Sequence, residues 1–186
     1  MTSPTVEDYL KQIWMLREGL GCERIPMGEL ARSLSVSPGT VTTMVKSISE
    51  AGLADYIPRL GVGLSPEGEA VALRMVRRHR LVECFLVEVL GMDWSEVHAE
   101  AEVLEHAVSD TVVERMAALM GDPAHDPHGN PIPARDGSIA GAGTLRPLSE
   151  CVPGASVVVA RVRQQPREVL DFLSGCGLKP GSGVEV

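Results

Sequence analysis

The sequence has few aromatic residues, no long apolar run and no paired cysteines. Aromatic residues make up 3% of the 186 positions, so leucine, valine, alanine and the eight methionines must supply most of the core. No stretch of about 18 apolar residues occurs, and the first residues lack the basic and apolar regions of a signal peptide. The four cysteines include no Cys-x-x-Cys pair, which argues against a disulfide framework or a zinc ribbon. We therefore expect a cytoplasmic protein with reduced thiols and no membrane association.

The chain also lacks the excess of basic residues that is typical of nucleic-acid-binding proteins. Its formal net charge is −8, which argues at first against such a partner. The negative charge is concentrated, however, in residues 93–110, which hold six carboxylates and no lysine or arginine. An acidic segment beside a separate DNA-reading segment would reconcile these numbers, and bound cations would reduce the negative charge.

The acidic segment carries a pattern that suggests a divalent metal site. On a helix of about 3.6 residues per turn, one stripe would hold four of its polar residues. These residues are His98, Glu102, Glu105 and His106. His79 and Glu83, four residues apart, would share the face of another helix. Oxygen ligands with a minority of nitrogen ligands suit a harder ion such as Mn²⁺ or Fe²⁺.

The first fifty residues predict a helix-turn-helix. Residues 5–18 have the apolar period of a helix, with Thr5 as N-cap and Asp8 at the capping-box position. Residues 26–34 form a second short helix. Ser37 and Pro38 are strong start signals for a third helix, which runs to about residue 51 after a three-residue turn.

The rest of the chain predicts a wing, a helical bundle and a partial β module. Residues 53–66 indicate two short strands around a glycine-containing turn, the wing of a winged helix. Helices are expected at 66–90, 95–107 and 110–120, with apolar faces that indicate a homodimer, followed by a linker over 121–146. Strands are expected at 157–162 and 181–186, on either side of a helix at 166–174. Two strands are too few to close a barrel, so we expect an unpaired strand edge. The predicted class is mainly α, with domains at 1–73, 74–140 and 141–186.

The start of the third helix supplies the candidate DNA contacts. Short hydroxyl side chains at a helix N-terminus can bind phosphates, and small residues allow close approach to base edges. The candidates on this helix are Ser37, Pro38, Gly39, Thr40, Thr42, Thr43 and Lys46. Arg32 and Arg59 are candidates for phosphate contacts. A dimer would read a palindrome with half-sites about one helical turn apart.

Several motifs together resemble the diphtheria toxin repressor family of metal-dependent transcriptional regulators, and within it the manganese transport regulators. The motifs occur in family order over nearly the whole chain. They are residues 6–16 (Val-Glu-Asp-Tyr-Leu-Lys-Gln-Ile-Trp-Met-Leu), 37–46, 78–83 (Arg-His-Arg-Leu-Val-Glu), Glu105-His106 with Ser109, and 127–133 (Pro-His-Gly-Asn-Pro-Ile-Pro). The resemblance implies an SH3-like (FeoA-like) third module, here incomplete.

The resemblance also implies two metal sites. Its primary site would consist of Asp8, Glu102, Glu105 and His106. Its second site would consist of His79, Glu83 and His98, completed by Asp126 and His128 or by Glu168 and Asp171.

The choice of metal follows from the primary site. Iron-type members carry methionine and cysteine at the positions of Asp8 and Glu102, whereas two carboxylates favour Mn²⁺ and leave Fe²⁺ as the alternative. Lys11 stands where manganese regulators without a third domain have an acidic residue, which argues against their closely spaced pair of metals. The resemblance thus implies a Mn²⁺-activated dimeric repressor of metal-uptake and homeostasis genes.

Two functions of other classes are alternatives. A di-metal carboxylate enzyme would need two Glu-x-x-His motifs on different helices, and the chain has neither. We therefore do not expect an enzyme. A winged-helix sensor of an organic ligand remains open, with the acidic cluster merely solvated; tight metal binding by the ligand-free protein would exclude it.

Overall fold

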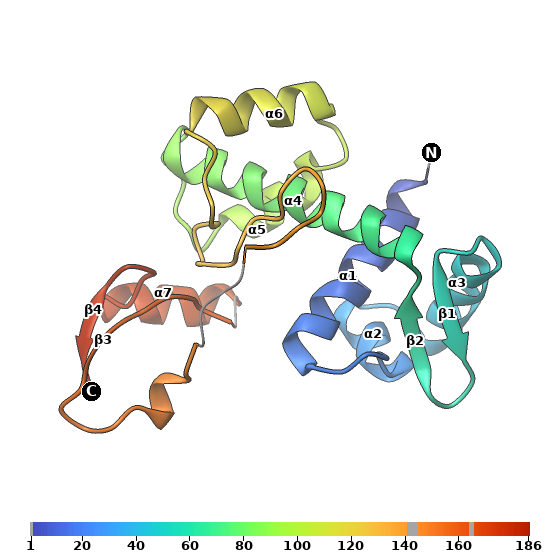
Figure 1. Ribbon diagram of the computed structural model, residues 1–186, viewed down its shortest axis with the longest axis horizontal. Coiled ribbons are helices and arrows are strands. Elements are labelled where there is room, and N and C mark those ends of the chain that lie inside the picture. Colours follow the sequence, from blue (N-terminus) through green and yellow to red (C-terminus); the bar gives the residue numbers. More distant parts are fainter. Residues whose placement is uncertain (1, 141–144, 164–165) are drawn as a thin grey trace. The chain divides into compact units, whose positions relative to one another are not determined.

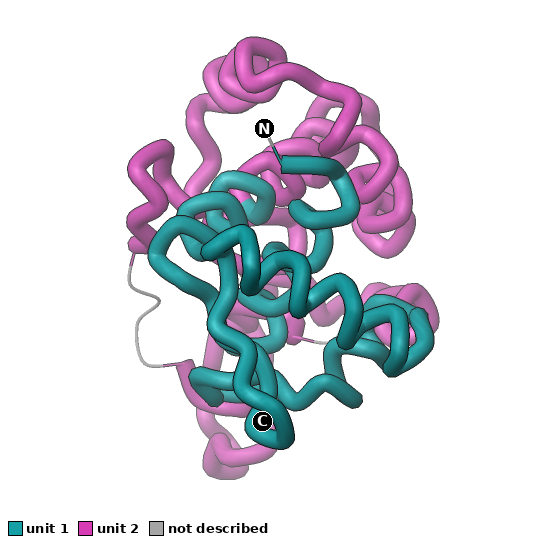
Figure 2. Tube along the Cα trace, turned by 90° about the vertical axis from the view of Figure 1, so that its right-hand side faces the viewer, with its two compact units in different colours: residues 1–76 teal, residues 77–186 magenta. Residues whose placement is uncertain are grey.

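The computed structural model describes residues 2–140, 145–163 and 166–186 and falls into two compact units. Unit 1 is Met1–Val76 and unit 2 is Arg77–Val186, so the division falls within a single long helix (Figure 2). Most described elements are helices, as the predicted mainly α class requires (Figure 1). The elements are α1 (Pro4–Leu20), α2 (Met27–Ser33), α3 (Pro38–Glu50), β1 (Ala54–Ile57), β2 (Gly61–Leu64), α4 (Pro66–Glu88), α5 (Val97–Leu104), α6 (Asp110–Leu119), a 3₁₀ turn (Leu148–Glu150), β3 (Ser156–Val158), α7 (Arg167–Gly175) and β4 (Gly183–Glu185).

The N-cap of helix α1 lies two residues before the predicted one. Ser3 is the N-cap, with its hydroxyl accepting from the Val6 amide at 3.4 Å, and Pro4 is the first helical residue. The prediction of Thr5 as N-cap was wrong because a proline is well accommodated at the first helical position, where its missing N–H would be unpaired in any case. Gly21 ends the helix in the left-handed conformation, with φ +64°.

The predicted helix-turn-helix and wing are both present in unit 1. Ser37 caps α3 through the Thr40 amide at 3.2 Å, and Pro38 opens the helix as predicted. Strands β1 and β2 pair antiparallel with Ala54 opposite Leu64, and Ile25 adds a bridge to Val62. Apolar residues of all three helices form much of the core of this unit, among them Leu10, Ile13, Trp14, Leu30, Val41, Val45 and Ile48. This arrangement is a winged helix.

A serine in the turn between α2 and α3 is held in a conformation that favours glycine. Ser35 has φ +54°, where an L side chain costs about 1–2 kcal/mol. We expect Ser35→Gly to stabilise the protein by about 0.5–1 kcal/mol, measured by urea unfolding. Ser47→Gly, in the exposed middle of α3, is the matched control and should destabilise. A lower midpoint for Ser35→Gly would contradict the expectation.

In unit 2, helix α4 packs against both α5 and α6. One apolar cluster joins α4 to α6 through Leu81, Cys84, Val113 and Ala117, and a second joins α4 to α5 through Val82, Leu86, Val97 and Ala101. Helix α5 begins later than predicted because Asp93 accepts from the Ser95 amide at 2.9 Å in a turn. It also ends at Leu104, so the prediction that Glu105 and His106 continue its helical stripe was wrong. Ser109 caps α6 as predicted.

Two arginines of α4, the partly buried Arg77 and the buried Arg80, anchor the segment that follows α6. Arg77 donates to the carbonyl of Pro133 at 2.9 Å, and Arg80 donates to the carbonyl of Pro131 at 2.5 Å. This segment is irregular, as the predicted linker requires, although residues 141–144 of the predicted range lie outside the described residues.

The C-terminal part of unit 2 is a small β module. Strand β3 is shorter than predicted and pairs antiparallel with β4, with Val157 opposite Val184. Helix α7 packs through Leu170 on Trp94 and Val162. Among the described residues, no helix is long and apolar enough to cross a membrane.

Candidate metal centre

The predicted ligands of unit 2 come from two packed helices. On α4, His79 and Glu83 share one face and are buried, with 4% and 1% exposed. On α5, His98 and Glu102 are four residues apart and partly exposed. Glu105 follows the last turn of α5 and is fully buried. The helical spacing therefore brings these side chains together as the sequence predicted.

The inner cluster consists of His79, Glu83 and His98. Nε2 of His79 lies 3.0 Å from Oε1 of Glu83 and 3.1 Å from Nδ1 of His98. Nδ1 of His98 lies 3.3 Å from the same Glu83 oxygen. The three ligand atoms lie within 4.8 Å of one another, a separation that one divalent ion could bridge after small adjustments.

The outer cluster consists of His79, Glu102 and Glu105, with His106 beside it. Nδ1 of His79 lies 2.5 Å from Oε2 of Glu105 and 3.6 Å from Oε1 of Glu102. Nε2 of His106 lies 3.5 Å from Oε1 of Glu105. Arg78 donates to the Glu105 carbonyl at 3.0 Å, which holds the end of α5 in place.

His79 belongs to both clusters, one ring nitrogen to each. Because Glu105 can only accept when ionised, the short contact makes Nδ1 of His79 the protonated nitrogen. Nε2 would then offer its lone pair to a cation held between Glu83 and His98. A carboxylate that orients a ligating imidazole in this way is the usual second partner of a metal-bound histidine. Glu105 therefore orients His79 for the inner cluster and is also a member of the outer cluster.

Asp8, the remaining predicted primary-site ligand, lies on α1 in unit 1. As a metal ligand, Asp8 would link the two units, and this role stays a prediction.

The loop after α6 adds a third group, the loop cluster of Glu83, Asp126 and His128. Nε2 of His128 donates to the Trp94 carbonyl at 2.9 Å, since a carbonyl can only accept. Nδ1 is then unprotonated in the neutral ring and lies 3.6 Å from Oε2 of Glu83, buried and without a hydrogen bond. An orphaned lone pair that faces a carboxylate is the arrangement that a cation would satisfy, so these residues fit a metal ion.

Asp126 has a structural role that its neighbours reveal. Its Oδ1 accepts from the amides of His128 and Asn130 at 2.8 and 2.9 Å, and its Oδ2 accepts from the Asn130 side chain at 2.8 Å. Arg80 lies 3.7 Å from the same Oδ2. These contacts build the loop and occupy most of the carboxylate, so His128 is the better placed ligand.

Sequence reasoning did not identify three partners of the loop cluster: Arg80, Trp94 and Asn130. The alternation Asp126-x-His128-x-Asn130 within a proline- and glycine-containing loop was the available signal for the turn. No comparable signal marks the Trp94 carbonyl, which acts through its backbone.

The two other candidates for completing the second site lie elsewhere. Glu168 and Asp171 are exposed on α7, and Asp171 lies 3.6 Å from Arg167. Within the described ranges, neither belongs to a group of ligand atoms close enough to hold one ion. The structure therefore brings Asp126 and His128 to Glu83, and it does not bring Glu168 or Asp171 there.

The buried charges of the loop cluster shift one another's pKa values. Burial alone would raise the pKa of Glu83, but the imidazoles of His79, His128 and His98 hold it well below its ordinary value. Burial alone would lower the pKa of His128, but Glu83 and Asp126 outweigh burial and raise it. Burial, together with the charge of Glu83, raises the pKa of Asp126. Without metal, the cluster therefore retains protons that a bound cation would displace.

These shifts predict how the stability of the metal-free protein depends on pH. Glu83, with a lowered pKa, stabilises the fold above its ordinary pKa of 4.5 and loses this contribution as the pH falls through the lowered value. His128, with a raised pKa, stabilises the fold below its ordinary pKa of 6.5 and loses this contribution as the pH rises through the raised value. Thermal unfolding with chelator should show highest stability in the mildly acidic range between them.

The His128→Gln variant should lose the stability decline on the alkaline side, whereas His125→Gln, at an exposed position of the same loop, should keep it. Identical alkaline behaviour of the parent and His128→Gln would contradict the assignment.

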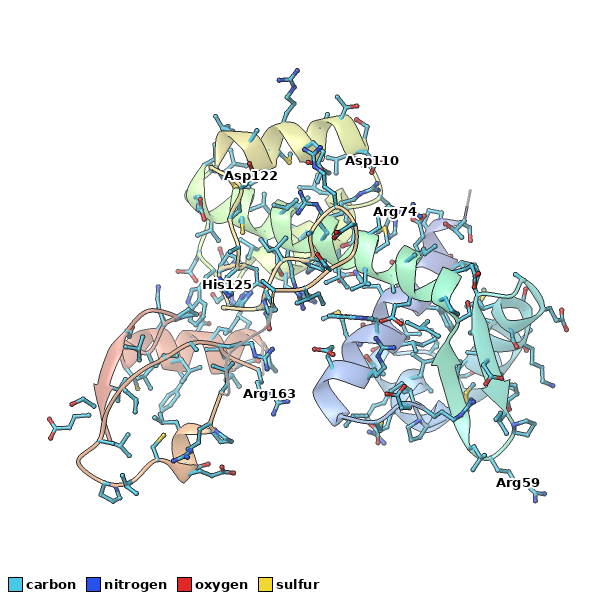
Figure 3. The ribbon with its side chains drawn as sticks, viewed as in Figure 1. Arg59, Arg74, Asp110, Asp122, His125 and Arg163 are labelled. Atoms are coloured by element: carbon cyan, nitrogen blue, oxygen red, sulfur yellow. The ribbon has the colours of Figure 1, made fainter. Side chains whose placement is uncertain are left out.

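The predicted DNA-contact residues lie on the solvent-facing side of the helix-turn-helix. Thr42 is half-buried, and the other candidates are exposed. The exposed candidates are Arg32, Ser37, Pro38, Gly39, Thr40, Thr43, Lys46 and Arg59. The hydroxyls of Thr42 and Thr43 donate to carbonyls of their own helix at 2.8 and 3.1 Å. Arg32 pairs with Glu29. Arg59 projects from the tip of the β1–β2 hairpin (Figure 3).

Family profiles match both units of the chain. The profile described as "Iron dependent repressor, N-terminal DNA binding domain" matches residues 1–62. The profile described as "Iron dependent repressor, metal binding and dimerisation domain" matches residues 65–134, which include both helices of the metal centre.

Individual relatives and solved structures point to the same family as the profiles. The chain is 37% identical to the iron-dependent repressor IdeR of Mycobacterium leprae over 196 residues, covering 98% of the chain and 83% of the relative. It is 31% identical to the diphtheria toxin repressor of Corynebacterium efficiens, covering 98% and 82%. A solved manganese-dependent transcriptional repressor in complex with manganese superposes with a TM-score of 0.89 at 40% identity, covering 97% of this chain and 82% of that one. The chain therefore belongs to the iron-dependent repressor family of metal-dependent transcriptional repressors.

Proposed function

We propose that this member of the family is activated by Mn²⁺ and represses genes for metal uptake and homeostasis by binding a palindromic operator as a homodimer. The observation that carries the choice of metal is the donor set. The clusters found in the described parts of the chain offer carboxylate oxygens and imidazole nitrogens and no sulfur. Such a set favours a hard ion over softer ones.

The one buried cysteine of the region supports this choice. Cys84 donates its thiol to the His125 carbonyl at 3.5 Å, and burial raises the pKa of that thiol. A thiol that stays protonated is a poor metal ligand. Fe²⁺ is the second candidate, because iron-dependent repressors are among the relatives and Fe²⁺ shares much of the ligand preference of Mn²⁺.

The residues of the centre suggest how metal would control the repressor. When bound, the ion supplies positive charge that offsets the repulsion among the gathered carboxylates. Glu105 then orients His79, and Glu83 faces the imidazoles of both the inner and the loop cluster. Asp8, on α1, is proposed to add a ligand from the DNA-binding unit. Metal would in this way favour one arrangement of the two units, which is coupling through differential contacts.

Exposed apolar side chains on α5 and α6 support the proposed dimer. Val103 and Leu119 are 71% and 69% exposed, and Val112 is 43% exposed. Water-exposed leucine and valine on neighbouring helices of a dimerisation domain favour burial against a second copy. Two winged helices related by twofold symmetry would bind half-sites about one turn of DNA apart. We propose that the protein acts in the cytoplasm, as a regulator that binds DNA.

The proposal is tested by selecting random DNA duplexes with the purified protein in Mn²⁺, in Fe²⁺ without oxygen, and with chelator, at fixed salt. One palindrome enriched with Mn²⁺ and lost with chelator is the expected result. Equal enrichment in all conditions would remove the metal from control, and enrichment with Fe²⁺ alone would replace Mn²⁺ by the second candidate.

A further inference from the structure

Unit 1, which contains the DNA-binding domain, carries more negative than positive charge. Residues 1–76 include nine aspartates or glutamates and seven lysines or arginines. Non-specific binding to DNA depends almost entirely on cations that neutralise phosphates. The exposed cations of this unit, and the carboxylates beside them, therefore decide how tightly the protein binds DNA of any sequence.

Fewer than half of the cations of unit 1 are available to a phosphate. Lys11 is buried, with 2% exposed. Three arginines are each paired with a carboxylate: Arg17 with Glu69, Arg24 with Asp55, and Arg32 with Glu29. Within the described part of unit 1, the cations that are exposed and outside an ion pair are Lys46, Arg59 and Arg74.

Two of the three ion pairs hold separate elements together. The Arg17 pair joins α1 to the first turn of α4. Arg24, in the loop before α2, donates to the carboxylate of Asp55 on β1 and also to its carbonyl at 3.0 Å. The Arg32–Glu29 pair differs, because its two residues are three apart on α2 and connect no other element. This pair therefore has no tertiary contact to maintain.

The Arg32–Glu29 pair lies on the surface of the helix that precedes α3. Nη1 of Arg32 donates to Oε2 of Glu29 at 2.5 Å, and the two side chains are 73% and 38% exposed. The first helix of a helix-turn-helix crosses the DNA backbone, so an exposed arginine on α2 is placed to meet phosphates. Glu29 cancels the charge of that arginine and presents a negative charge of its own to the same phosphates.

We propose that Glu29 limits metal-independent binding to DNA by neutralising Arg32, so that the unmetallated protein binds little DNA. The inference rests on the proposed function, because weak binding without metal is useful to a repressor that metal switches on. Phosphate contacts strengthen binding to every sequence about equally. A small electrostatic contribution therefore leaves the metal-gated contacts to provide most of the affinity for the operator.

The expected effect follows from the counterions that a phosphate contact releases. Each phosphate neutralised by an arginine steepens the fall of log K with log salt concentration by about 0.9. A dimer has two copies of Arg32, so freeing both should steepen the slope by about 1–2. Affinity for a random duplex should then rise by roughly 10-fold at about 50 mM salt and by less at about 200 mM.

The test compares Glu29→Gln with Glu67→Gln in the full chain with chelator present. Glu67 is exposed in the first turn of α4 and belongs to none of the ion pairs of the described residues. The control therefore loses the same charge, and the same favourable place near a helix N-terminus, without freeing an arginine. Fluorescence anisotropy of a labelled random-sequence duplex gives the affinity and its salt dependence. Glu29→Gln should show the steeper slope and the higher affinity, and Glu67→Gln should match the parent.

Two further variants show whether Arg32 is the cation that is freed. The double variant Glu29→Gln/Arg32→Gln should lose the added slope. Glu29→Ala, with the high helix propensity of alanine, decides the matter if Glu29→Gln fails to fold. Unchanged slopes in both Glu29 variants, or an equal increase in Glu67→Gln, would overturn the inference.

The regulatory consequence is measured on the operator in the same series. At a fixed protein concentration in chelator, Glu29→Gln should occupy more of the operator than the parent does. Equal occupancy by the two proteins, with the Mn²⁺ response of the parent intact, would overturn this inference alone. Operator binding by the parent that does not depend on Mn²⁺ would instead overturn the proposed function, and with it the regulatory role of Glu29.

Discussion

Replacing Glu105 by alanine is expected to abolish metal-dependent DNA binding while leaving the helix content unchanged. Glu105 is fully buried and both of its oxygens face histidines: Oε2 lies 2.5 Å from His79 and Oε1 lies 3.5 Å from His106. Alanine removes a ligand from the outer cluster and the acceptor that orients His79 for the inner cluster. Because one substitution impairs two clusters, its effect should exceed that of replacing Glu102 or His106.

The measurement is operator binding with and without Mn²⁺, together with far-ultraviolet circular dichroism. His106→Ala should likewise lose the response, since it removes an imidazole from the same cluster. Glu100→Ala, at an exposed position of α5, is the matched control and should respond like the parent. A full metal response in both Glu105→Ala and His106→Ala would remove the outer cluster from the switch.

The local signals in the sequence predicted most of the fold. Serine followed by proline at 37–38 and Ser109 before an apolar period identified two helix starts, because capping depends on neighbouring residues alone. The same logic misplaced the start of α1, where Ser3-Pro4 competed with Thr5. Helix α5 was predicted too long because the turn at Asp93 depends on a side-chain acceptor that periodicity does not reveal.

The metal centre could be predicted only as far as helical spacing reaches. Spacing placed His79 with Glu83 and His98 with Glu102, since residues four apart share a helix face. It could not show that His79 joins two clusters, because that depends on how α4 packs against α5. The orientation of His128 depends on the Trp94 carbonyl, 34 residues away in the sequence, so no local pattern contains it.

Replacing Glu83 by glutamine is expected to remove metal from both the inner and the loop cluster. The Glu83 carboxylate lies 3.0 Å from His79, 3.3 Å from His98 and 3.6 Å from His128, so three imidazoles share this one anion. Glutamine keeps the shape of the side chain but provides no negative charge and only one ligating oxygen. The inner cluster would then have only neutral donors, which are poor ligands for a hard ion.

Mn²⁺ bound per chain should fall, with affinity at the affected sites lowered by roughly 100-fold, the upper end of what even outer-shell changes cause. Electron paramagnetic resonance of free Mn²⁺ measures both quantities. Glu88→Gln, exposed near the end of the same helix, is the matched control. An unchanged number of bound ions in Glu83→Gln would show that Glu83 is only a buried partner of the histidines.

The DNA response of Glu83→Gln separates two designs of the switch. If operator binding still requires Mn²⁺ at the parent's concentration, the outer cluster alone controls the repressor and the other clusters have a stabilising role. If much more Mn²⁺ is required, the clusters act together, and His79 is the residue through which they can do so, because its two ring nitrogens contact Glu105 on one side and Glu83 on the other. The structure favours the second design, since a buried imidazole held by two carboxylates transmits a change at either one to the other.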